Sequence, residues 1–283
     1  MADDRSYTPP LVAFEDLRPL PDKVRVAVCV FTYNHFAHID VLKYTANLAG
    51  QMQDHPRLDA LAVTHSAGYP TDRCRNAALA RAASDGFHFC YMLDDDMAPD
   101  LYANEPGAKP FLPTALDFAL AQPRPVLVGA PYCAGPPHCE VVVMRDQITM
   151  PYQQAGCGTA IGKFGRDEAA AKTGIEEVAA LPTGGLLVDT RVTQVLAPPW
   201  FYYEYADPPH NTALASTEDV VFTRNLAWLG VRNYVNWDSW FGHHKRLLVG
   251  KPVRSPVRQV PAAVWDAFRR GWVPELDDAG GQP

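Results

Sequence analysis

The chain has 283 residues, of which 47% are hydrophobic and 20% are charged, the balance of a globular protein with a substantial core. A formal net charge of −7 excludes a broadly basic surface for nucleic acid or anionic membrane, although it says little about local patches. The acidic start lacks the apolar core of a signal peptide, and no apolar run is long enough to span a bilayer. We therefore expect a cytoplasmic protein without a membrane anchor.

The first half of the chain alternates between strand and helix patterns. Residues 1–22 are polar and proline-rich, and we expect either an N-terminal arm laid over the surface or a disordered segment. Continuous apolar runs predict strands at 24–32, 58–66 and 87–93, and helices are predicted at about 37–53 and from Thr71 or Asp72 to Gly86. Strands and helices that alternate with short connections are typical of a parallel, doubly wound sheet.

The second half is less regular. Strands are predicted at 126–132, 139–145 and 231–236, and a strand, a glycine turn and another strand within 174–190. A helix is predicted to open at Ser216–Asp219 and to run through Leu229 to a stop at Gly230. No internal repeat or long linker is visible, so the sequence predicts one α/β domain over 23–250, with a mainly parallel twisted sheet flanked by helices, and a tail at 251–283.

An unusual run of acids follows the third predicted strand, in the stretch FCYMLDDDMAP. Three carboxylates at the mouth of a buried strand repel one another and resist desolvation. In an open parallel sheet, ligands bind at this end of the strands, and Mg²⁺ and Mn²⁺ favour carboxylate oxygens. Alternate residues of a strand point the same way, so Asp94 and Asp96 can face one ion while Asp95 points elsewhere. The alternative is a solvated acidic turn.

Two further groups of polar residues have both a functional and a structural interpretation. Glu218 and Asp219 open a predicted helix, where the helix dipole favours carboxylates, so they are either site residues or ordinary helix-start acids. His243 and His244 can supply an imidazole to manganese, or they form a surface pair. Adjacent histidines point in different directions, so we expect only one of them to bind a metal, with His243 slightly favoured.

An ordered set of motifs from about Val24 to Lys245 resembles the GT-A glycosyltransferases, in particular family 2-like members. Some enzymes of this type occur in bacteriophages. The set comprises a Thr-Tyr-Asn turn after the first strand, a helix with Arg73 and Asn76, the run LDDDM, and the segments PTGGLLVDT and STEDVVFTRNLAWLG. These enzymes are dependent on nucleotide sugars and carry an Asp-x-Asp motif. The resemblance implies a nucleotide-sugar-binding half at 23–132 and an acceptor half at 133–250, in a bacterial or phage-infected cell.

The resemblance also implies roles for single residues. Thr32, Tyr33 and Asn34 would line the base pocket, and Arg73 and Asn76 would approach the base or the diphosphate. Asp94 would approach the ribose or a metal-bound water, Asp95 would lie in the same nucleotide-sugar site, and Asp96 would bind Mn²⁺ or Mg²⁺ together with His243 or His244. Arg75 and Arg81, by contrast, are expected on an exposed helix face.

In inverting members of this family the second acid of the Glu-Asp pair is the general base, which points to Asp219 with Glu218 beside it. In a retaining enzyme the same acid would position the donor sugar instead. Aromatic faces stack on sugars, so Trp200, Tyr202, Tyr203 and Trp240 are acceptor-site candidates, as are Gly184 and Gly185 by resemblance. Core packing is the alternative for Phe201 and one of the tryptophans.

The sequence therefore predicts a metal-dependent hexosyl- or pentosyltransferase that takes a nucleotide diphosphate sugar, with UDP favoured, and slightly favours inversion. The acceptor is open between a glycan, a small molecule, a protein and modified DNA, including a 5-hydroxymethylpyrimidine in DNA. The basic stretch Lys251–Arg258 can contact phosphates or form a solvated arm. Two other classes of protein stay open. One is a non-catalytic relative that binds a nucleotide sugar. The other is a nucleotidyltransferase, a class that usually has a glycine-rich loop after its first strand, whereas the equivalent stretch here, TYNHFAHID, has no glycine.

Overall fold

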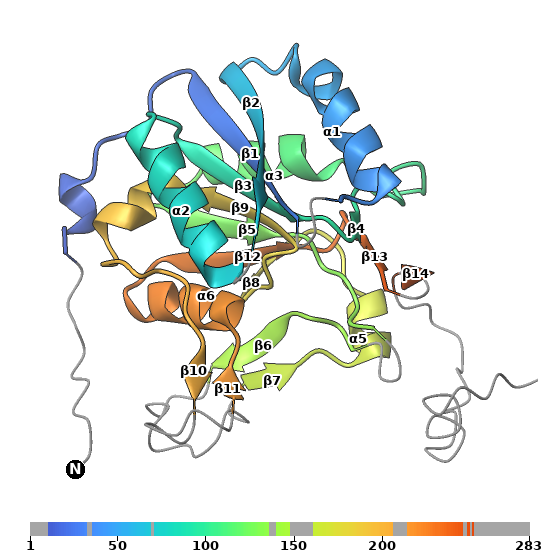
Figure 1. The fold of residues 1–283 in the computed structure, drawn as a ribbon. Helices are drawn as coiled ribbons and strands as arrows, with labels where there is room; N and C mark the ends of the chain where they lie inside the picture. Colours follow the sequence, from blue (N-terminus) through green and yellow to red (C-terminus); the bar gives the residue numbers. More distant parts are fainter. Residues whose placement is uncertain are drawn as a thin grey trace, which may run out of the picture.

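Seven strands form the central sheet of the computed structural model (Figure 1). They are β1 (Val24–Thr32), β2 (Leu58–Ala67), β3 (Phe89–Asp94), β5 (Val126–Gly129), β8 (Ile175–Val178), β9 (Gly185–Asp189) and β12 (Arg232–Asn236). Their order is β2-β1-β3-β9-β5-β12-β8, in which β8 and β9 run antiparallel to their neighbours and the remaining pairs are parallel. The prediction of an α/β fold with a mainly parallel sheet is confirmed.

The structure describes residues 11–32, 36–68, 71–135, 140–147, 161–205, 214–245, 248–249 and 251. Helices cover both faces of the sheet (Figure 1). On one face lie α1 (Ile39–Met52) and α3 (Phe111–Leu120), and on the other α2 (Thr71–Ser84) and α6 (Glu218–Trp228). Among the described residues, no helix is both long and apolar enough to span a bilayer.

Shorter elements surround this three-layer core. The other helices in the described part of the chain are η1 (Phe14–Asp16), α5 (Arg166–Ala170) and η2 (Thr190–Gln194). Three small sheets pair β4 (Met97–Ala98) with β13 (Gly242–His244) and β14 (Leu248–Val249), β6 (Met144–Gln147) with β7 (Ile161–Lys163), and β10 (Glu204–Tyr205) with β11 (Leu214–Ser216). The pairing of β13 with β4 brings the end of the described chain beside the aspartates.

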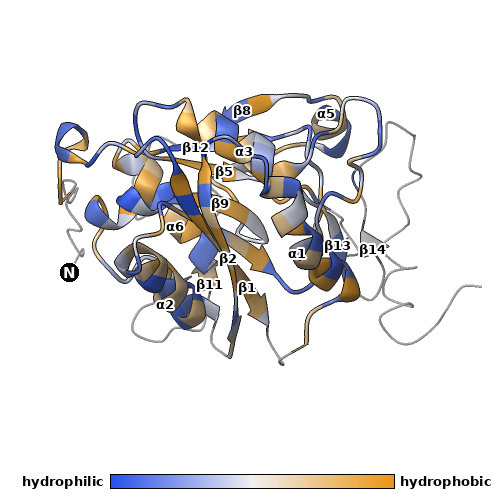
Figure 2. Ribbon diagram, turned by 90° about the horizontal axis from the view of Figure 1, so that it is seen from above, coloured by the Kyte–Doolittle hydropathy of each residue, from blue (hydrophilic) through white to orange (hydrophobic). Residues whose placement is uncertain are grey.

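Alternation along β1 explains why its sequence is apolar at every position except Arg25 and Thr32. Val24, Val26, Val28 and Val30 belong to the hydrophobic cluster under α1 and α3, whereas Ala27, Cys29 and Phe31 belong to the cluster under α2 and α6. The central strands are accordingly mostly orange in Figure 2, while α2 carries both colours. In β3 the same alternation assigns Cys90 and Met92 to the α2 face, so the next residue of that set, Asp94, also faces α2.

Two segments differ from the sequence-based expectations. The apolar segment at α3 was not predicted, although its buried positions repeat at helical spacing. The strand predicted at 139–145 was wrong: among the described residues of that stretch, Val141 makes one isolated bridge to Cys133, and a strand begins only at Met144. This stretch has β-branched residues but lies outside the central sheet, so it has no long strand to pair with.

Asp100 is a half-buried carboxylate that makes stability depend on pH. It has a left-handed backbone (φ 53°), and its Oδ1 accepts a hydrogen bond from the Phe111 backbone at 2.8 Å. Burial raises its pKa to about 6, even though this hydrogen bond opposes the shift. The unfolded chain has a pKa of about 3.9, so the folded state holds the proton more tightly, and stability is lost as pH rises from about 4 to about 6.

Replacing Asp100 with asparagine should therefore stabilise the protein at pH 7.5 by about 1–3 kcal/mol, with little effect at pH 4. Asparagine keeps the acceptor oxygen and tolerates the left-handed backbone. Urea unfolding at both pH values measures the difference, with Asp54→Asn as the control at an exposed acid. An equal gain at both pH values would contradict the ionisation argument.

Candidate functional site

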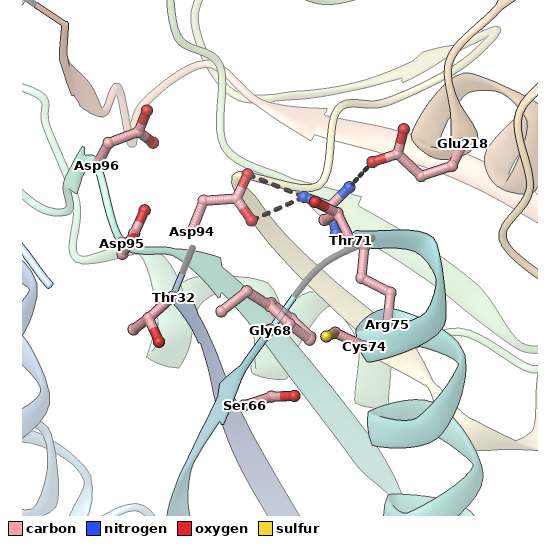
Figure 3. A pocket seen from close by; sticks show the side chains of 11 residues that line it. Thr32, Ser66, Gly68, Thr71, Cys74, Arg75, Asp94, Asp95, Asp96 and Glu218 are labelled. Carbon is pink, nitrogen blue, oxygen red and sulfur yellow. Dashed lines mark hydrogen bonds and ion pairs between the residues drawn. The ribbon is translucent and has the colours of Figure 1, made fainter. Parts of the chain in front are cut away.

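A pocket of about 190 Å³ opens at the carboxyl ends of β1, β2 and β3, beside the starts of α2 and α6 (Figure 3). It is lined by Phe31, Thr32, Ser66, Gly68, Thr71, Cys74, Arg75, Asp94, Asp95, Asp96 and Glu218. This is the edge at which open parallel sheets bind ligands. The acidic run that the sequence singled out thus lies at the mouth of a pocket and not in an isolated surface turn.

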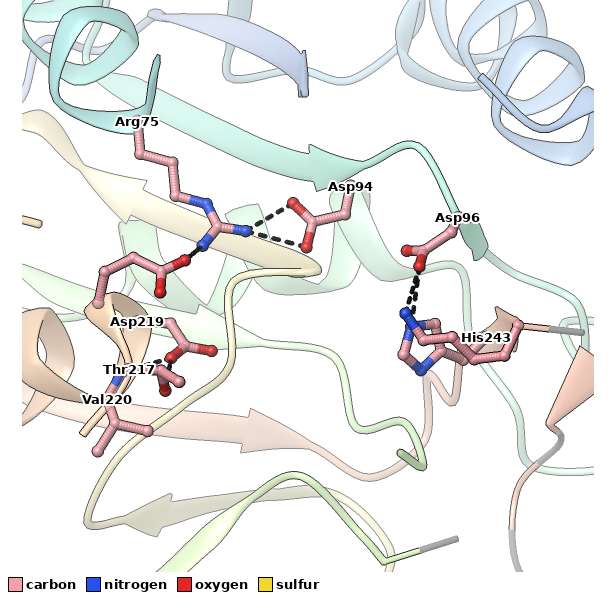
Figure 4. A network of polar contacts seen from close by, with 9 residues as sticks. Arg75, Asp94, Asp96, Thr217, Asp219, Val220 and His243 are labelled. Atoms are coloured by element: carbon pink, nitrogen blue, oxygen red, sulfur yellow. Dashed lines mark hydrogen bonds and ion pairs between the residues drawn. The ribbon is translucent and has the colours of Figure 1, made fainter. Parts of the chain in front are cut away.

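Arg75 joins two of the acids across this pocket (Figures 3 and 4). Its Nη2 donates to both carboxylate oxygens of Asp94, at 2.7 and 2.9 Å, and its Nη1 donates to Oε1 of Glu218. Burial by itself would lower the pKa of Arg75, but the charges of Asp94 and Glu218 raise it. The guanidinium is therefore a permanent positive charge held between two carboxylates.

The exposed position predicted for Arg75 was wrong, whereas the same prediction for Arg81 is confirmed. The side chain of Arg81 is 80% exposed, but Arg75 is only 4% exposed. Arg75, Leu79 and Ala82 are the buried residues of α2, and their spacing places them on one helix face. That spacing was the available signal, because it puts Arg75 in line with two apolar residues that pack against the sheet.

The two acids at the start of α6 have different surroundings. Glu218 is buried, and burial raises its pKa although the charge of Arg75 opposes the shift. Asp219 is half-buried, and its Oδ1 accepts hydrogen bonds from the Thr217 hydroxyl and, at 2.8 Å, from the Val220 backbone (Figure 4). Its Oδ2 has no hydrogen-bond partner within the described part of the chain, so this oxygen is available to a ligand.

Asp96 and His243 face each other away from the Arg75 network (Figure 4). His243 Nε2 lies 3.2 Å from Oδ2 of Asp96, and its Nδ1 lies 2.8 Å from the carbonyl oxygen of Cys133. A carbonyl oxygen only accepts, so Nδ1 carries a hydrogen and Nε2 is the nitrogen turned toward the carboxylate. Histidines that bind metals commonly donate one N–H to a backbone carbonyl in this way. The Asp96 and His243 pair therefore fits a divalent cation.

Lys245 adds a positive charge to the same carboxylate. Its Nζ lies 2.6 Å from Oδ2 of Asp96. Burial would raise the pKa of Asp96, but the hydrogen bonds and charges of His243 and Lys245 together hold it below its usual range. His244 turns the other way and contacts Asp40, so the expectation that the two histidines point in different directions is confirmed.

The residues that the resemblance implied for the nucleotide do not all reach the pocket. Thr32 is buried and lines it, whereas Tyr33 and Asn34 lie outside the described residues. Arg73 is exposed and is absent from the pocket lining.

Asn76 has a structural role in place of the expected nucleotide contact. Its amide nitrogen donates to the carbonyl oxygens of Asp72 and Phe201, and its oxygen accepts from the backbone of Trp200 at 2.8 Å and of Phe201 at 3.1 Å. These bonds use both ends of the amide group. The expected nucleotide contact of Asn76 is therefore corrected: this side chain holds the loop that leads to Phe201 against α2.

Two of the aromatic acceptor candidates are core residues. Trp200 is 8% exposed and donates from Nε1 to the Leu196 carbonyl at 2.7 Å, and Trp240 is 6% exposed and packs on Trp237. The sugar-stacking role expected for these two tryptophans is wrong because both side chains are buried in the hydrophobic core. Tyr202 and Tyr203 are half-buried, and an acceptor contact through either one stays a prediction.

Gly184 and Gly185 allow a close approach of β9 to its neighbours. A Cβ at Gly184 would lie 2.8 Å from the Tyr132 hydroxyl, and one at Gly185 would lie 2.4 Å from Cε2 of Phe241. The Gly184 carbonyl also accepts from the backbone of Asp94 at 3.2 Å. The two glycines thus help to position Asp94, and their contact with an acceptor stays a prediction.

Tyr132 is a site residue that the sequence did not reveal. Burial raises its pKa well above its usual range, and the charges of Asp94 and Asp219 raise it further, so its hydroxyl stays protonated. Its ring packs edge-on against His243 at 5.1 Å between centroids. It follows the strand β5 in the short stretch APYC, which has no motif of its own. Only the tertiary structure places it among the acids.

Comparison with known proteins gives a likeness of fold. No protein-family model and no curated protein sequence matches the chain. Among solved structures, the chain is similar to A197 from STIV, with a TM-score of 0.50 and 12% sequence identity. The likeness covers 83% of this chain and 98% of that one. At such low identity it bears on the fold and not on the activity.

Proposed function

We propose that this protein is a metal-dependent glycosyltransferase that moves a sugar from a nucleotide diphosphate sugar, with UDP favoured, to an acceptor hydroxyl. The observation that carries the proposal is the pocket at the carboxyl ends of β1, β2 and β3, which gathers Asp94, Asp96 and Glu218. The fold likeness to A197 from STIV supports the α/β fold alone.

Asp96 and His243 are the residues that would hold Mn²⁺ or Mg²⁺. The Nδ1 contact of His243 with the Cys133 carbonyl supports this assignment, because it leaves Nε2 turned toward the Asp96 carboxylate. Such an ion supplies positive charge to a diphosphate leaving group. Lys245, which pairs with Asp96, carries a second positive charge toward the same region. Asp94 is engaged by Arg75 on both oxygens, which favours a role in donor positioning for it.

Asp219 is the residue best suited to act as general base. Its Oδ2 is available, whereas Glu218 is buried against Arg75. In the inverting reaction Asp219 takes the proton of the acceptor hydroxyl while that oxygen forms a bond to the anomeric carbon. The bond from this carbon to the diphosphate oxygen breaks, and the nucleoside diphosphate leaves with the electron pair. In a retaining reaction Asp219 would position the donor sugar.

In this proposal the residues around these groups have separate roles. Arg75 keeps Asp94 and Glu218 in fixed positions and balances their charges. Tyr132 remains a neutral hydroxyl beside the acids and packs on His243, so it can donate a hydrogen bond to a bound ligand. These residues would fix the positions of the acids that meet the donor at the edge of the sheet.

The test is a calorimetric titration of UDP into the protein with Mn²⁺ and with a chelator, followed by GDP, CDP and ADP. We expect one nucleotide, UDP, to bind only with the metal, and Asp96→Ala and His243→Ala to remove that binding while circular dichroism stays unchanged. Asp117→Ala is the matched control, because Asp117 also pairs with a histidine, His55, but lies outside the pocket. Nucleotide binding that is equally strong with Mn²⁺ and with the chelator, or that persists in Asp96→Ala, would contradict the assignment of Asp96 as a metal ligand.

The acceptor is addressed once the donor is known. Glycans, small molecules, proteins and DNA that contains 5-hydroxymethylpyrimidines are each offered with the donor that binds. Residues 252–258 of the basic stretch lie outside the described part of the chain, and Lys251 pairs with Glu105. Turnover on modified DNA that falls as salt rises would favour the DNA acceptor, and salt-independent turnover on a free sugar would remove it.

A further inference from the structure

A second cluster of potential metal ligands lies beside the pocket, on the opposite side of β13 from His243. It consists of His38, Asp40 and His244, whose ligand atoms all lie within 4.8 Å of one another. His244 Nε2 is 2.8 Å from Oδ2 of Asp40, and His38 Nδ1 is 3.5 Å from the same oxygen. The proposed function uses none of these contacts.

The backbone holds the two histidines in place before any ligand binds. The His38 N–H donates to the carbonyl of Asp95 at 2.8 Å, and the His244 N–H donates to that of Asp96 at 2.6 Å. The two rings consequently stack, with centroids 3.3 Å apart and planes 20° apart. Consecutive carbonyls of the aspartate turn thus bring together residues that are 206 positions apart in the sequence.

The chemistry of the cluster fits a borderline cation better than a hard one. Two imidazoles and one carboxylate suit Zn²⁺, Co²⁺ and Ni²⁺, whereas Mg²⁺ and Ca²⁺ take oxygen ligands. Half-burial leaves the cluster open to solvent: the side chains of His38, Asp40 and His244 are 38%, 34% and 16% exposed.

We propose that His38, Asp40 and His244 form a binding site for a divalent transition ion, zinc in the first place, that fastens β13 to the start of α1. The two elements lie side by side in Figures 1 and 2. The weak contact of 3.3 Å between His38 Nδ1 and the Asp40 N–H gives way to the ion. Because His243 and His244 are neighbours on β13, the ion also steadies the strand that carries His243.

The test is a titration of Zn²⁺ alone into tag-free protein that carries His243→Ala, which removes the other candidate metal ligand pair. The His243→Ala protein is expected to bind a single zinc ion, to show no binding of Mg²⁺, and to give a visible d–d absorption band with Co²⁺. Adding His38→Ala or Asp40→Asn should weaken zinc binding by about 100-fold or more and abolish the Co²⁺ band. Adding His55→Ala, which breaks a histidine–aspartate pair elsewhere on the surface, should change neither.

The outcomes separate this site from the proposed function. The zinc site is contradicted if the His243→Ala protein does not bind zinc, or if adding His38→Ala does not change the zinc affinity. In either case the three residues form a hydrogen-bonded cluster without a metal. Asp40→Asn preserves the shape of the side chain, so it tests the ligand even if His38→Ala disturbs the start of α1. Nucleotide binding does not enter the measurement, and its success or failure leaves the result unchanged.

Discussion

Replacing Arg75 with methionine is expected to lower the free energy of unfolding by about 3–5 kcal/mol, the cost of leaving buried charge without its partner. Arg75 is 4% exposed and pairs with Asp94 and with Glu218, which is itself 6% exposed. Methionine fills a similar apolar volume but brings no charge, so Glu218 must stay ionised without compensation or take up a proton. Urea unfolding at pH 7 measures the loss.

The same helix offers a matched control for this prediction. Arg81→Met removes an identical group from a position that is 80% exposed, and its effect should stay within about 0.5 kcal/mol. Adding Glu218→Gln to Arg75→Met should recover part of the stability, because one of the two uncompensated acids is then neutral. A loss of less than about 1 kcal/mol for Arg75→Met would mean that water satisfies both carboxylates.

Asparagine in place of Asp219 is expected to reduce sugar transfer by about 10²- to 10⁴-fold, the range for loss of a general base. The substitution keeps Oδ1, which accepts from the Val220 backbone, so the start of α6 should be preserved. Metal-dependent UDP affinity should not change, because Asp219 is absent from the lining of the pocket in which we propose that the donor binds. The initial rate of UDP release from the donor sugar, with and without acceptor, measures the effect.

Asp167→Asn is the control for Asp219→Asn. Asp167 lies in the first turn of α5 and is exposed, so the control removes the same charge from another helix start. An unchanged rate of sugar transfer in Asp219→Asn would contradict the assignment of Asp219 as the general base. The anomeric configuration of the product, read by nuclear magnetic resonance, then decides the stereochemistry: retention would move Asp219 to donor positioning.

Local patterns anticipated the sheet well because they report burial. The run at 24–32 is apolar at all positions but Arg25 and Thr32 because both faces of β1 are covered. The acids that begin at the last residue of β3 stand out because nothing in a core strand favours them. The same patterns were silent about α3 and wrong about 139–145, where β-branched residues pack without joining the central sheet.

Sequence-based reasoning failed for polar and aromatic side chains that can either bind a ligand or stabilise the fold. Trp200 and Trp240 are aromatic enough to stack on sugars, but the core takes both rings. Asn76 has the chemistry of a nucleotide ligand, but its amide holds the backbone at Trp200 and Phe201. A residue type states which interactions are available, and the neighbouring chain decides which one is made.

The sequence by itself determined the α/β class, the strand-end position of Asp94–Asp96 and the helix-start position of Glu218 and Asp219, because periodicity and capping act over a few neighbouring residues. Only the tertiary structure decided the partners. Arg75 meets Glu218 across 143 positions, and His243 meets Asp96 across 147. Such pairs depend on the order of the strands in the sheet, which no local pattern encodes.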